Sequence, residues 1–229
     1  MISVAIDGPA GAGKSTIAKK IAENMGYIYV DTGALYRTVA LSLINNGISS
    51  DDVAAVEKHL EKINVDLCYI NGEQRVLLNG TDVSSKIRTP EVSMMASTSS
   101  ALPVVRAFLL ELQRKMAVEH DVVMDGRDIA TVVLPNATVK IFLTADVEDR
   151  AKRRYDELIL KDPTITYEDV LKDVIQRDKN DSTRAVAPLK PAEDSIILNT
   201  TGNTLDQSIE LLINTVKNNI WKWFYERIL

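Results

Sequence analysis

ISVAIDGPAGAGKSTIA, residues 2–18, carries the strongest structural signal in the chain. An apolar run at 2–6 leads into a glycine-rich turn, and a helical pattern leaves the turn at 14–25. Between them, GPAGAGKS at 8–15 fits the pattern G-x-x-x-x-G-K-[ST]. This pattern is typical of a loop that holds phosphate groups when it joins a strand to a helix. The context here meets that condition, so we expect a nucleoside triphosphate to bind at this loop.

The chemistry of the loop follows from its residue types. Glycines let the backbone adopt conformations closed to other residues, and successive N–H groups at the start of a helix converge on an anion. Lys14 adds a positive charge for the β- and γ-phosphates, and the Ser15 hydroxyl is the expected ligand of Mg²⁺. The predicted ATP contacts are Gly8, Pro9, Ala10, Gly11, Ala12, Gly13, Lys14, Ser15 and Thr16.

Composition narrows the class of protein. The chain has 229 residues and a formal net charge of -5, so it has no overall basic field of the kind that attracts nucleic acid. Cys68 is the only cysteine, and His59 and His120 lie outside any metal-ligand spacing. The start of the chain lacks a signal-peptide pattern, and no apolar run approaches a membrane span. We therefore expect a cytoplasmic protein that acts on small molecules, without nucleic-acid or membrane partners.

Short apolar strands alternate with helical segments along the chain. This alternation predicts an α/β fold with a doubly wound, five-stranded parallel sheet and helices on both faces. The predicted strands are 2–6, 27–30, 122–124, 139–143 and 195–198. The main predicted helices are 14–25, 34–45, 51–62, 147–161, 167–179 and 205–227.

Two segments depart from this alternation. Residues 64–83 alternate apolar and polar, and two Asn-Gly turns divide them, which predicts a small antiparallel sheet. Residues 87–119 are mostly helical, with breaks near two prolines, and a polar stretch framed by Pro163 and Pro188 is a plausible lid. We predict a single phosphate-loop domain over 1–229, with a core at 1–62, 104–154 and 186–229, an insert at 63–103 and a helical lid at 155–185.

Arginines and acids follow the predicted strands. Ligands of doubly wound sheets bind beyond the carboxyl ends of the strands, where Arg127 and, one helical turn further, Arg37 are expected. Together with Arg106, they could hold a second phosphate opposite Lys14. The segment Asp125–Asp128 directly follows a buried strand, where unpaired charges cannot stay buried. Any single arginine could instead be a solvated surface charge, as could the basic run at 150–154.

A third group lies in the predicted lid. Arg177, Asp181 and Arg184 have helical spacing, so one face could present all three, although Arg177 and Asp181 could also form an ordinary surface ion pair. No guanine-reading N-K-x-D pattern is present, which disfavours a GTP switch. Two alternatives stay open on the residues alone. One is a kinase of another small molecule, and the other is a nucleotide-dependent binding module that uses 51–83 as its partner surface.

Four segments together resemble the bacterial cytidylate kinases: GPAGAGKST at 8–16, DTGALYR at 31–37, DGRDIATVVLP at 125–135 and RDKNDSTRAVAPL at 177–189. The resemblance covers essentially the whole chain, including the insert. It implies transfer of a phosphoryl group from ATP, with Mg²⁺, to CMP or dCMP. The acceptor is already an oxyanion near neutral pH, so alignment and charge neutralisation would suffice without a strong general base.

The resemblance also implies residue roles. Arg37, Arg127 and Arg184 would clamp the acceptor phosphate, Ser97, Arg106 and Asp128 would read the cytosine, and Arg177 and Asp181 would contact the pentose. Arg150 would meet the adenine end of ATP, and Thr32 would take the place of a serine common in relatives. The residues expected to act in catalysis are Lys14, Arg127, Asp128 and Arg184. A monomer is expected.

Overall fold

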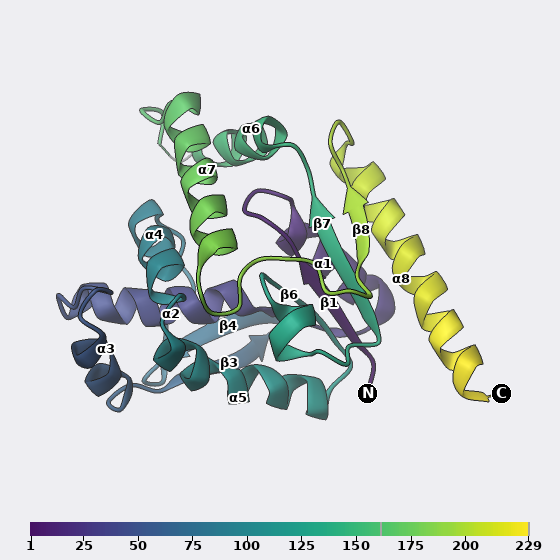
Figure 1. Ribbon diagram of the computed structural model, residues 1–229, viewed down its shortest axis with the longest axis horizontal. Coiled ribbons are helices and arrows are strands. Elements are labelled where there is room, and N and C mark those ends of the chain that lie inside the picture. The colour runs from purple at the N-terminus through teal and green to yellow at the C-terminus, as the bar shows by residue number, and fades with distance from the viewer. Residues whose placement is uncertain (161, 229) are drawn as a thin grey trace.

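The computed structural model describes residues 1–160 and 162–228. Lys161, inside the predicted lid, and Leu229 lie outside the described residues. The main sheet has the order β2-β6-β1-β7-β8, and every neighbouring pair is parallel. This confirms the predicted five-stranded parallel sheet (Figure 1). The strands are β1 (Ser3–Asp7), β2 (Ile28–Asp31), β6 (Val122–Gly126), β7 (Val139–Thr144) and β8 (Ile196–Asn199).

The two faces of the sheet bury different side chains of the same strand. From β1, Val4 and Ile6 pack with the helices α1 (Lys14–Met25) and α8 (Leu205–Ile228). Ala5 instead joins a cluster with α5 (Pro103–Glu119) and the short π-helix η1 (Ile129–Val133). Helices therefore cover both faces, and all of β1 except Ser3 is buried between them, which places the loop after it at the centre of the molecule.

A second, antiparallel sheet forms from β3 (Val65–Ile70), β4 (Glu73–Leu78) and β5 (Thr81–Asp82). Both predicted Asn-Gly turns connect its strands. Asn71 and Asn79 have φ values of 53° and 50°, and each following glycine also has a positive φ, as turns of this kind require. This sheet shares a hydrophobic cluster with the helices α2 (Thr32–Asn45), α3 (Val53–Leu60) and α4 (Pro90–Ser99).

The helices α6 (Val147–Leu158) and α7 (Tyr167–Thr183) pack on each other through a separate small cluster. In Figure 1 they lie together beyond the end of β7, away from the rest of the sheet. The predicted end of α7 at 179 is too early. The helix continues to Thr183, and the Arg184 N–H still donates to the carbonyl of Asn180 at 3.2 Å. The hydroxyls of Ser182 and Thr183 donate to carbonyls one turn back, at 2.7 Å each, which helical geometry allows.

The helix α2 begins two residues before its predicted start. The Asp31 carboxylate accepts from the Ala34 N–H at 2.9 Å and so caps the helix at Thr32. The predicted helices 51–62 and 147–161 are shorter in the structure, at Val53–Leu60 and Val147–Leu158.

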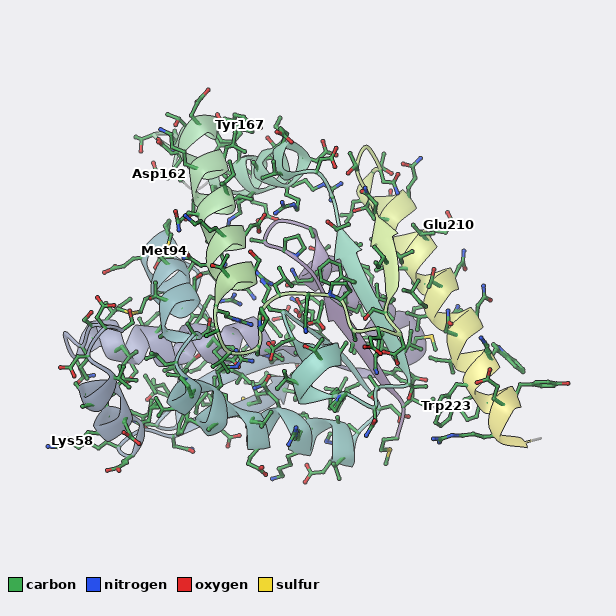
Figure 2. All side chains as sticks on the ribbon, in the orientation of Figure 1. Lys58, Met94, Asp162, Tyr167, Glu210 and Trp223 are labelled. Atoms are coloured by element: carbon green, nitrogen blue, oxygen red, sulfur yellow. The ribbon has the colours of Figure 1, made fainter. Side chains whose placement is uncertain are left out.

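The C-terminal aromatic residues are mainly on the surface. Trp221 is 77% exposed and Tyr225 is 66% exposed, while the inner face of α8 buries Leu212 and Val216. Trp223, near the end of α8, lies at the edge of the molecule opposite to the α6–α7 pair (Figure 2). Within the described residues, no single helix is long and apolar enough to cross a membrane. Only the pair α4 and α5, bent by 100°, reaches that length and composition together.

Candidate active site

A cavity of about 330 Å³ lies at the carboxyl ends of β1, β2 and β6. The glycine-rich loop at 8–15 and the starts of α1 and α2 form one side, and α4, α5, α6 and α7 supply the rest of the wall. This is the edge of the sheet where the sequence predicted the ligand. The predicted site residues that line it are Ala10, Gly11, Gly13, Lys14, Ser15, Thr16, Thr32, Arg37, Ser97, Arg106, Arg127, Asp128, Arg177, Asp181 and Arg184.

The loop between β1 and α1 is tightly packed from below. Gly8 has φ 151°, and a Cβ there would lie 1.9 Å from the carbonyl oxygen of Leu143. Gly11 has φ 74°, and its Cβ would lie 2.7 Å from the carbonyl oxygen of Arg150. Only glycine fits either position, which explains two of the glycines in the motif. The loop is therefore held against β7 and α6 in one conformation.

Lys14 and Arg150 both bind loop carbonyls. The Lys14 ammonium donates to the carbonyl of Pro9 at 2.7 Å, and burial together with the positive charge of Arg127 lowers its pKa well below the usual value. Arg150 donates to the carbonyl of Ala10 at 2.9 Å and pairs with Asp178 of α7 at 2.6 Å. Arg150 thus packs against the loop and does not line the cavity. The loop residues Gly8, Pro9 and Ala12 do not line the cavity either. Its contact with adenine stays a prediction.

Two side chains with oxygen atoms suited to binding a metal ion, Ser15 and Asp125, lie beside Lys14. The Ser15 hydroxyl donates to the Asp125 carboxylate at 2.9 Å, and Tyr29 donates to its other oxygen at 2.9 Å. Burial, reinforced by the negative charge of Asp31, raises the pKa of Asp125. A hydroxyl and a carboxylate are the hard ligands that Mg²⁺ takes alongside phosphate oxygens, so these residues fit the metal. Among the described residues, no group of three or more His, Cys, Asp or Glu side chains is arranged to hold a metal ion.

The lining carries an excess of positive charge although the chain is acidic. Eight lysine or arginine side chains and five aspartate or glutamate side chains line the cavity, an excess of three positive charges. The whole chain carries -5. Such a concentration of guanidinium groups at one concave site is suited to anionic ligands with several phosphates.

Asp31 gathers one group of cations. Its carboxylate accepts from Arg37 at 2.9 Å and from Arg88 at 2.8 Å, besides capping α2. Burial would raise the pKa of Asp31, but Arg37, Arg88 and the Ala34 N–H outweigh burial and lower it. The two arginines come from different elements, α2 and the segment before α4, so Asp31 joins them at one wall of the cavity.

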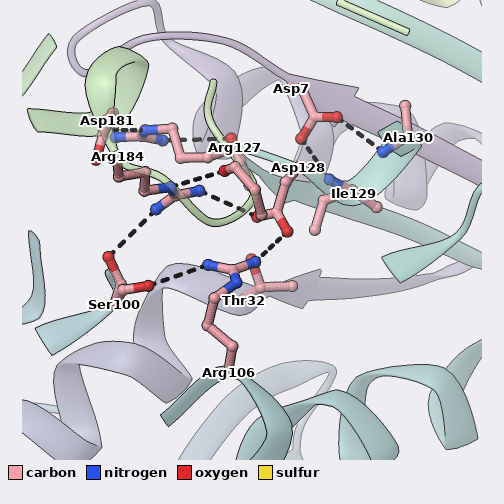
Figure 3. A network of polar contacts seen from close by, with 12 residues as sticks. Asp7, Thr32, Ser100, Arg106, Arg127, Asp128, Ile129, Ala130, Asp181 and Arg184 are labelled. Carbon is pink, nitrogen blue, oxygen red and sulfur yellow. Dashed lines mark hydrogen bonds and ion pairs between the residues drawn. The ribbon is translucent and has the colours of Figure 1, made fainter. Parts of the chain in front are cut away.

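Asp128 gathers a second group (Figure 3). Arg106 of α5 donates to one oxygen and Arg184 to the other at 3.5 Å, and both arginines also bind Ser100. Burial raises the pKa of Asp128, against the opposing effect of these arginines. Close by, the Ser97 hydroxyl is buried without a hydrogen-bond partner among the described residues. This corner therefore offers several buried polar groups to one ligand.

Asp181 lies among three arginines. Arg127 donates to it at 2.7 Å, and Arg177 and Arg184 also stabilise its charged form. Burial would raise the pKa of Asp181, but these arginines lower it. Arg177 has no such close partner for its buried Nε, and burial with repulsion from Arg127 lowers its pKa to about 10. The predicted grouping of Arg177, Asp181 and Arg184 thus lies on the cavity, with Arg184 just beyond the end of α7.

Sequence reasoning missed part of this lining. It did not single out Asp31 or Arg88, and it treated Arg154 only as one of a basic run. Asp7 was also missed: its two oxygens accept from the N–H groups of Ile129 and Ala130 at 2.8 Å each (Figure 3). Burial raises the pKa of Asp7 to about 6. Asp7 is the last residue of the apolar strand β1, and that position is the signal that could have found it.

The fold and this site together define a P-loop kinase. A solved structure with the same fold is a gluconokinase from Sinorhizobium meliloti 1021, with a TM-score of 0.54 and 12% identity over 98% of this chain and 97% of that one. At that identity the similarity concerns the fold alone.

Sequence comparison resolves the family. The family described as cytidylate kinase matches residues 4–218. Cytidylate kinases from Carboxydothermus hydrogenoformans and Caldicellulosiruptor bescii are 46% and 47% identical over 95% and 96% of this chain, and 99% of each relative is covered. The chain belongs to the cytidylate kinase family and is an enzyme, a nucleoside monophosphate kinase. The resemblance noted in the sequence is thereby confirmed, and the binding-module alternative is set aside.

Proposed function

We propose that this enzyme transfers the γ-phosphoryl group of ATP directly to CMP or dCMP and releases ADP with CDP or dCDP. One observation supports this most: a single cavity joins the phosphate-type loop to a set of arginines and has an excess of three positive charges. The names and high identity of the relatives support the choice of a cytidine monophosphate as acceptor.

The donor side is the loop and its helix. Backbone N–H groups of the loop and Lys14 would hold the β- and γ-phosphates, with Ala10, Gly11, Gly13 and Thr16 lining the same side. Ser15 and Asp125 would hold Mg²⁺, which neutralises charge on the transferring phosphoryl group when bound. The oxygens of the two residues already lie 2.9 Å apart, so one cation can reach both.

The acceptor side is made of guanidinium groups. Arg37, Arg127 and Arg184 would hold the monophosphate in line with ATP, with Thr32 beside them. The acceptor oxygen needs no strong base, and in the part of the chain that the structure describes no histidine lines the cavity. The predicted lid at 155–185, which contains the end of α6 and all of α7, would close over both nucleotides and keep water from acting as a competing acceptor.

The base would be read at the Asp128 corner. Asp128 can accept from the exocyclic amine of cytosine, which uracil lacks, while Arg106 and the free hydroxyl of Ser97 can meet its other polar atoms. Arg177 and Asp181 would contact the pentose. We also propose that the enzyme acts as a monomer, with the division into core, insert and lid given above.

The test is a coupled assay of ADP release over a panel of monophosphates, with CMP, dCMP, UMP, AMP and GMP as acceptors. CMP and dCMP are expected to give the highest kcat/KM. In Asp128→Ala, the ratio of kcat/KM for CMP over UMP should fall by about tenfold or more. An unchanged ratio contradicts the assignment of Asp128. ATP binding with no ADP release on any monophosphate contradicts the proposed function itself.

A further inference from the structure

The outer edge of β2 is covered by side chains instead of a strand. β2 is the first strand in the order of the main sheet, so within residues 1–160 and 162–228 no strand pairs with its other edge. Tyr69 donates its hydroxyl to the carbonyl of Tyr29 at 3.0 Å. Gln74 accepts from the N–H of Asp31 at 2.8 Å and donates to the carbonyl of the same residue at 3.3 Å. All three contacts come from the antiparallel sheet, from β3 and β4.

Gln74 and Tyr69 differ in the main-chain groups that they bind: Gln74 binds both the N–H and the carbonyl of Asp31, and Tyr69 binds only the carbonyl of Tyr29. A side-chain amide has the donor and acceptor of a peptide group, and Gln74 uses both on the single residue Asp31. It therefore takes the place of a neighbouring strand at this one position and holds the main chain of Asp31 through both its N–H and its carbonyl. Tyr69 makes one bond to a residue that does not line the main cavity.

Asp31 is the residue whose side chain organises one wall of the cavity. It caps α2, and it pairs with Arg37 and Arg88 at 2.9 Å and 2.8 Å. A rotation of its main chain would move all three contacts together. Gln74 therefore reaches the guanidinium groups of this wall through Asp31: its amide binds the Asp31 main chain, and the Asp31 carboxylate binds both arginines. The side chain of Gln74 itself does not line the main cavity.

We propose that Gln74 is a positioning residue for the acceptor phosphate, acting through Asp31 on Arg37 and Arg88. This rests on the proposed function, because it assigns the wall beside Asp31 to the acceptor. Without Gln74, the end of β2 and the first turn of α2 lose their fixed main-chain conformation. The arginines then have to be ordered when the monophosphate binds, and this ordering costs affinity. The antiparallel sheet gains a specific role: it orients part of the substrate site from outside it.

Gln74→Met tests the proposal, with Tyr69→Phe as the matched control. Methionine is unbranched and of similar size, lacks both hydrogen-bonding groups, and has room beside a second cavity of about 200 Å³ that Gln74 and Asp31 line. Tyr69→Phe removes one bond between the same sheet and the same strand, but leaves Asp31 held. Gln74→Glu keeps the acceptor for the Asp31 N–H but places a carboxylate oxygen where the amide donated to the Asp31 carbonyl.

The readouts are KM for CMP, KM for ATP, kcat and the thermal unfolding temperature. In Gln74→Met, we expect KM for CMP to rise about tenfold, as the loss of two hydrogen bonds allows, with kcat and KM for ATP within about twofold of the parent. Gln74→Glu should also raise KM for CMP, because its carboxylate oxygen repels the Asp31 carbonyl oxygen. Tyr69→Phe should lower the unfolding temperature without changing KM for CMP, because a purely structural contact does not separate the two substrates.

An unchanged KM for CMP in both Gln74 variants, or an equal rise in Tyr69→Phe, overturns the inference. In Gln74→Met, a fall in kcat together with a rise in KM for both CMP and ATP also overturns the inference, since that pattern means general damage to the enzyme. The parent enzyme separates this failure from that of the proposed function. If the parent does not phosphorylate CMP, the function is wrong, whereas an active parent with indifferent Gln74 variants refutes only the positioning role.

Discussion

Replacing Asp181 with asparagine tests whether the cavity depends on its acidic residues before any substrate binds. Asp181→Asn keeps the shape of the side chain and removes the charge that Arg127, Arg184 and Arg177 share. The Arg127 and Asp181 side chains are 22% and 7% exposed and lie 2.7 Å apart, so water screens the pair only weakly. A hydrogen bond to a charged group contributes about 1.5–3 kcal/mol, and asparagine still offers a neutral acceptor. We expect a loss of about 2 kcal/mol of unfolding free energy.

The pH dependence gives this prediction its sign. The pKa of Asp181 is lower in the folded protein than in the unfolded chain. Its contribution to stability is therefore fully present above the unfolded value of about 3.9 and is lost as the pH falls through the folded value. The difference between parent and Asp181→Asn should be complete at pH 7 and should narrow below about pH 4, where the unfolded carboxyl has become protonated.

Urea unfolding followed by far-ultraviolet circular dichroism measures this difference in unfolding free energy at each pH, and thermal unfolding followed in the same way gives the melting temperature. At pH 7, the melting temperature of Asp181→Asn should be about 4–8 °C lower than that of the parent. The control is Asp194→Asn: Asp194 also pairs with a cation, Lys140, but its side chain is 65% exposed, and a change below about 1 kcal/mol is expected. A loss in Asp181→Asn no larger than in the control, or one that does not narrow in acid, would refute the electrostatic account.

Three further outcomes follow from the donor side. Gly8→Ala places a Cβ 1.9 Å from the carbonyl oxygen of Leu143, so calorimetry should detect no ATP binding by this variant. Gly26→Ala, whose Cβ has no atom within 4 Å, is the control and should still bind ATP. Lys14→Met should lower single-turnover phosphoryl transfer by about a hundredfold or more, with the Kd for CMP nearly unchanged; a lost affinity for CMP would mean a structural role. Asp125→Asn should raise the Mg²⁺ concentration needed for half-maximal rate, and an unaltered requirement would exclude this carboxylate from the metal site.

The sequence predicted the sheet because its signals were local. Apolar strands, glycine turns and the loop motif each depend on a few neighbouring residues, and the structure confirms the five strands and both Asn-Gly turns. Helix ends were harder, since they depend on side-chain contacts. The start of α2 is fixed by the Asp31 carboxylate, and α7 continues past its predicted end until the Arg184 N–H makes the last helical bond, to Asn180.

The contacts that organise the site were beyond the sequence because they join distant segments. Asp7 holds η1 through the N–H groups of Ile129 and Ala130, which are 122 and 123 positions away in the chain. Nothing in the pattern of 129–133 indicates a π-helix, since the carboxylate that orients its first N–H groups belongs to β1. Likewise, Arg88 carries no local signal, and only the packing of its segment brings it to Asp31.

The acidic residues of the cavity explain how so many arginines can stay close together in a folded enzyme. A buried cation without a partner is costly. Here Asp31 and Asp128 each pair with two guanidinium groups, and Asp181 pairs with Arg127 while its charge also attracts Arg184 and Arg177. In the proposed reaction, phosphate oxygens would take over some of these contacts. Each exchange replaces one negative partner by another, so the arginines need not be newly desolvated or brought together when the substrate binds. In the same proposal, a carboxylate such as Asp31, whose main chain is hydrogen-bonded to Gln74, determines the positions of its arginines before the phosphate binds.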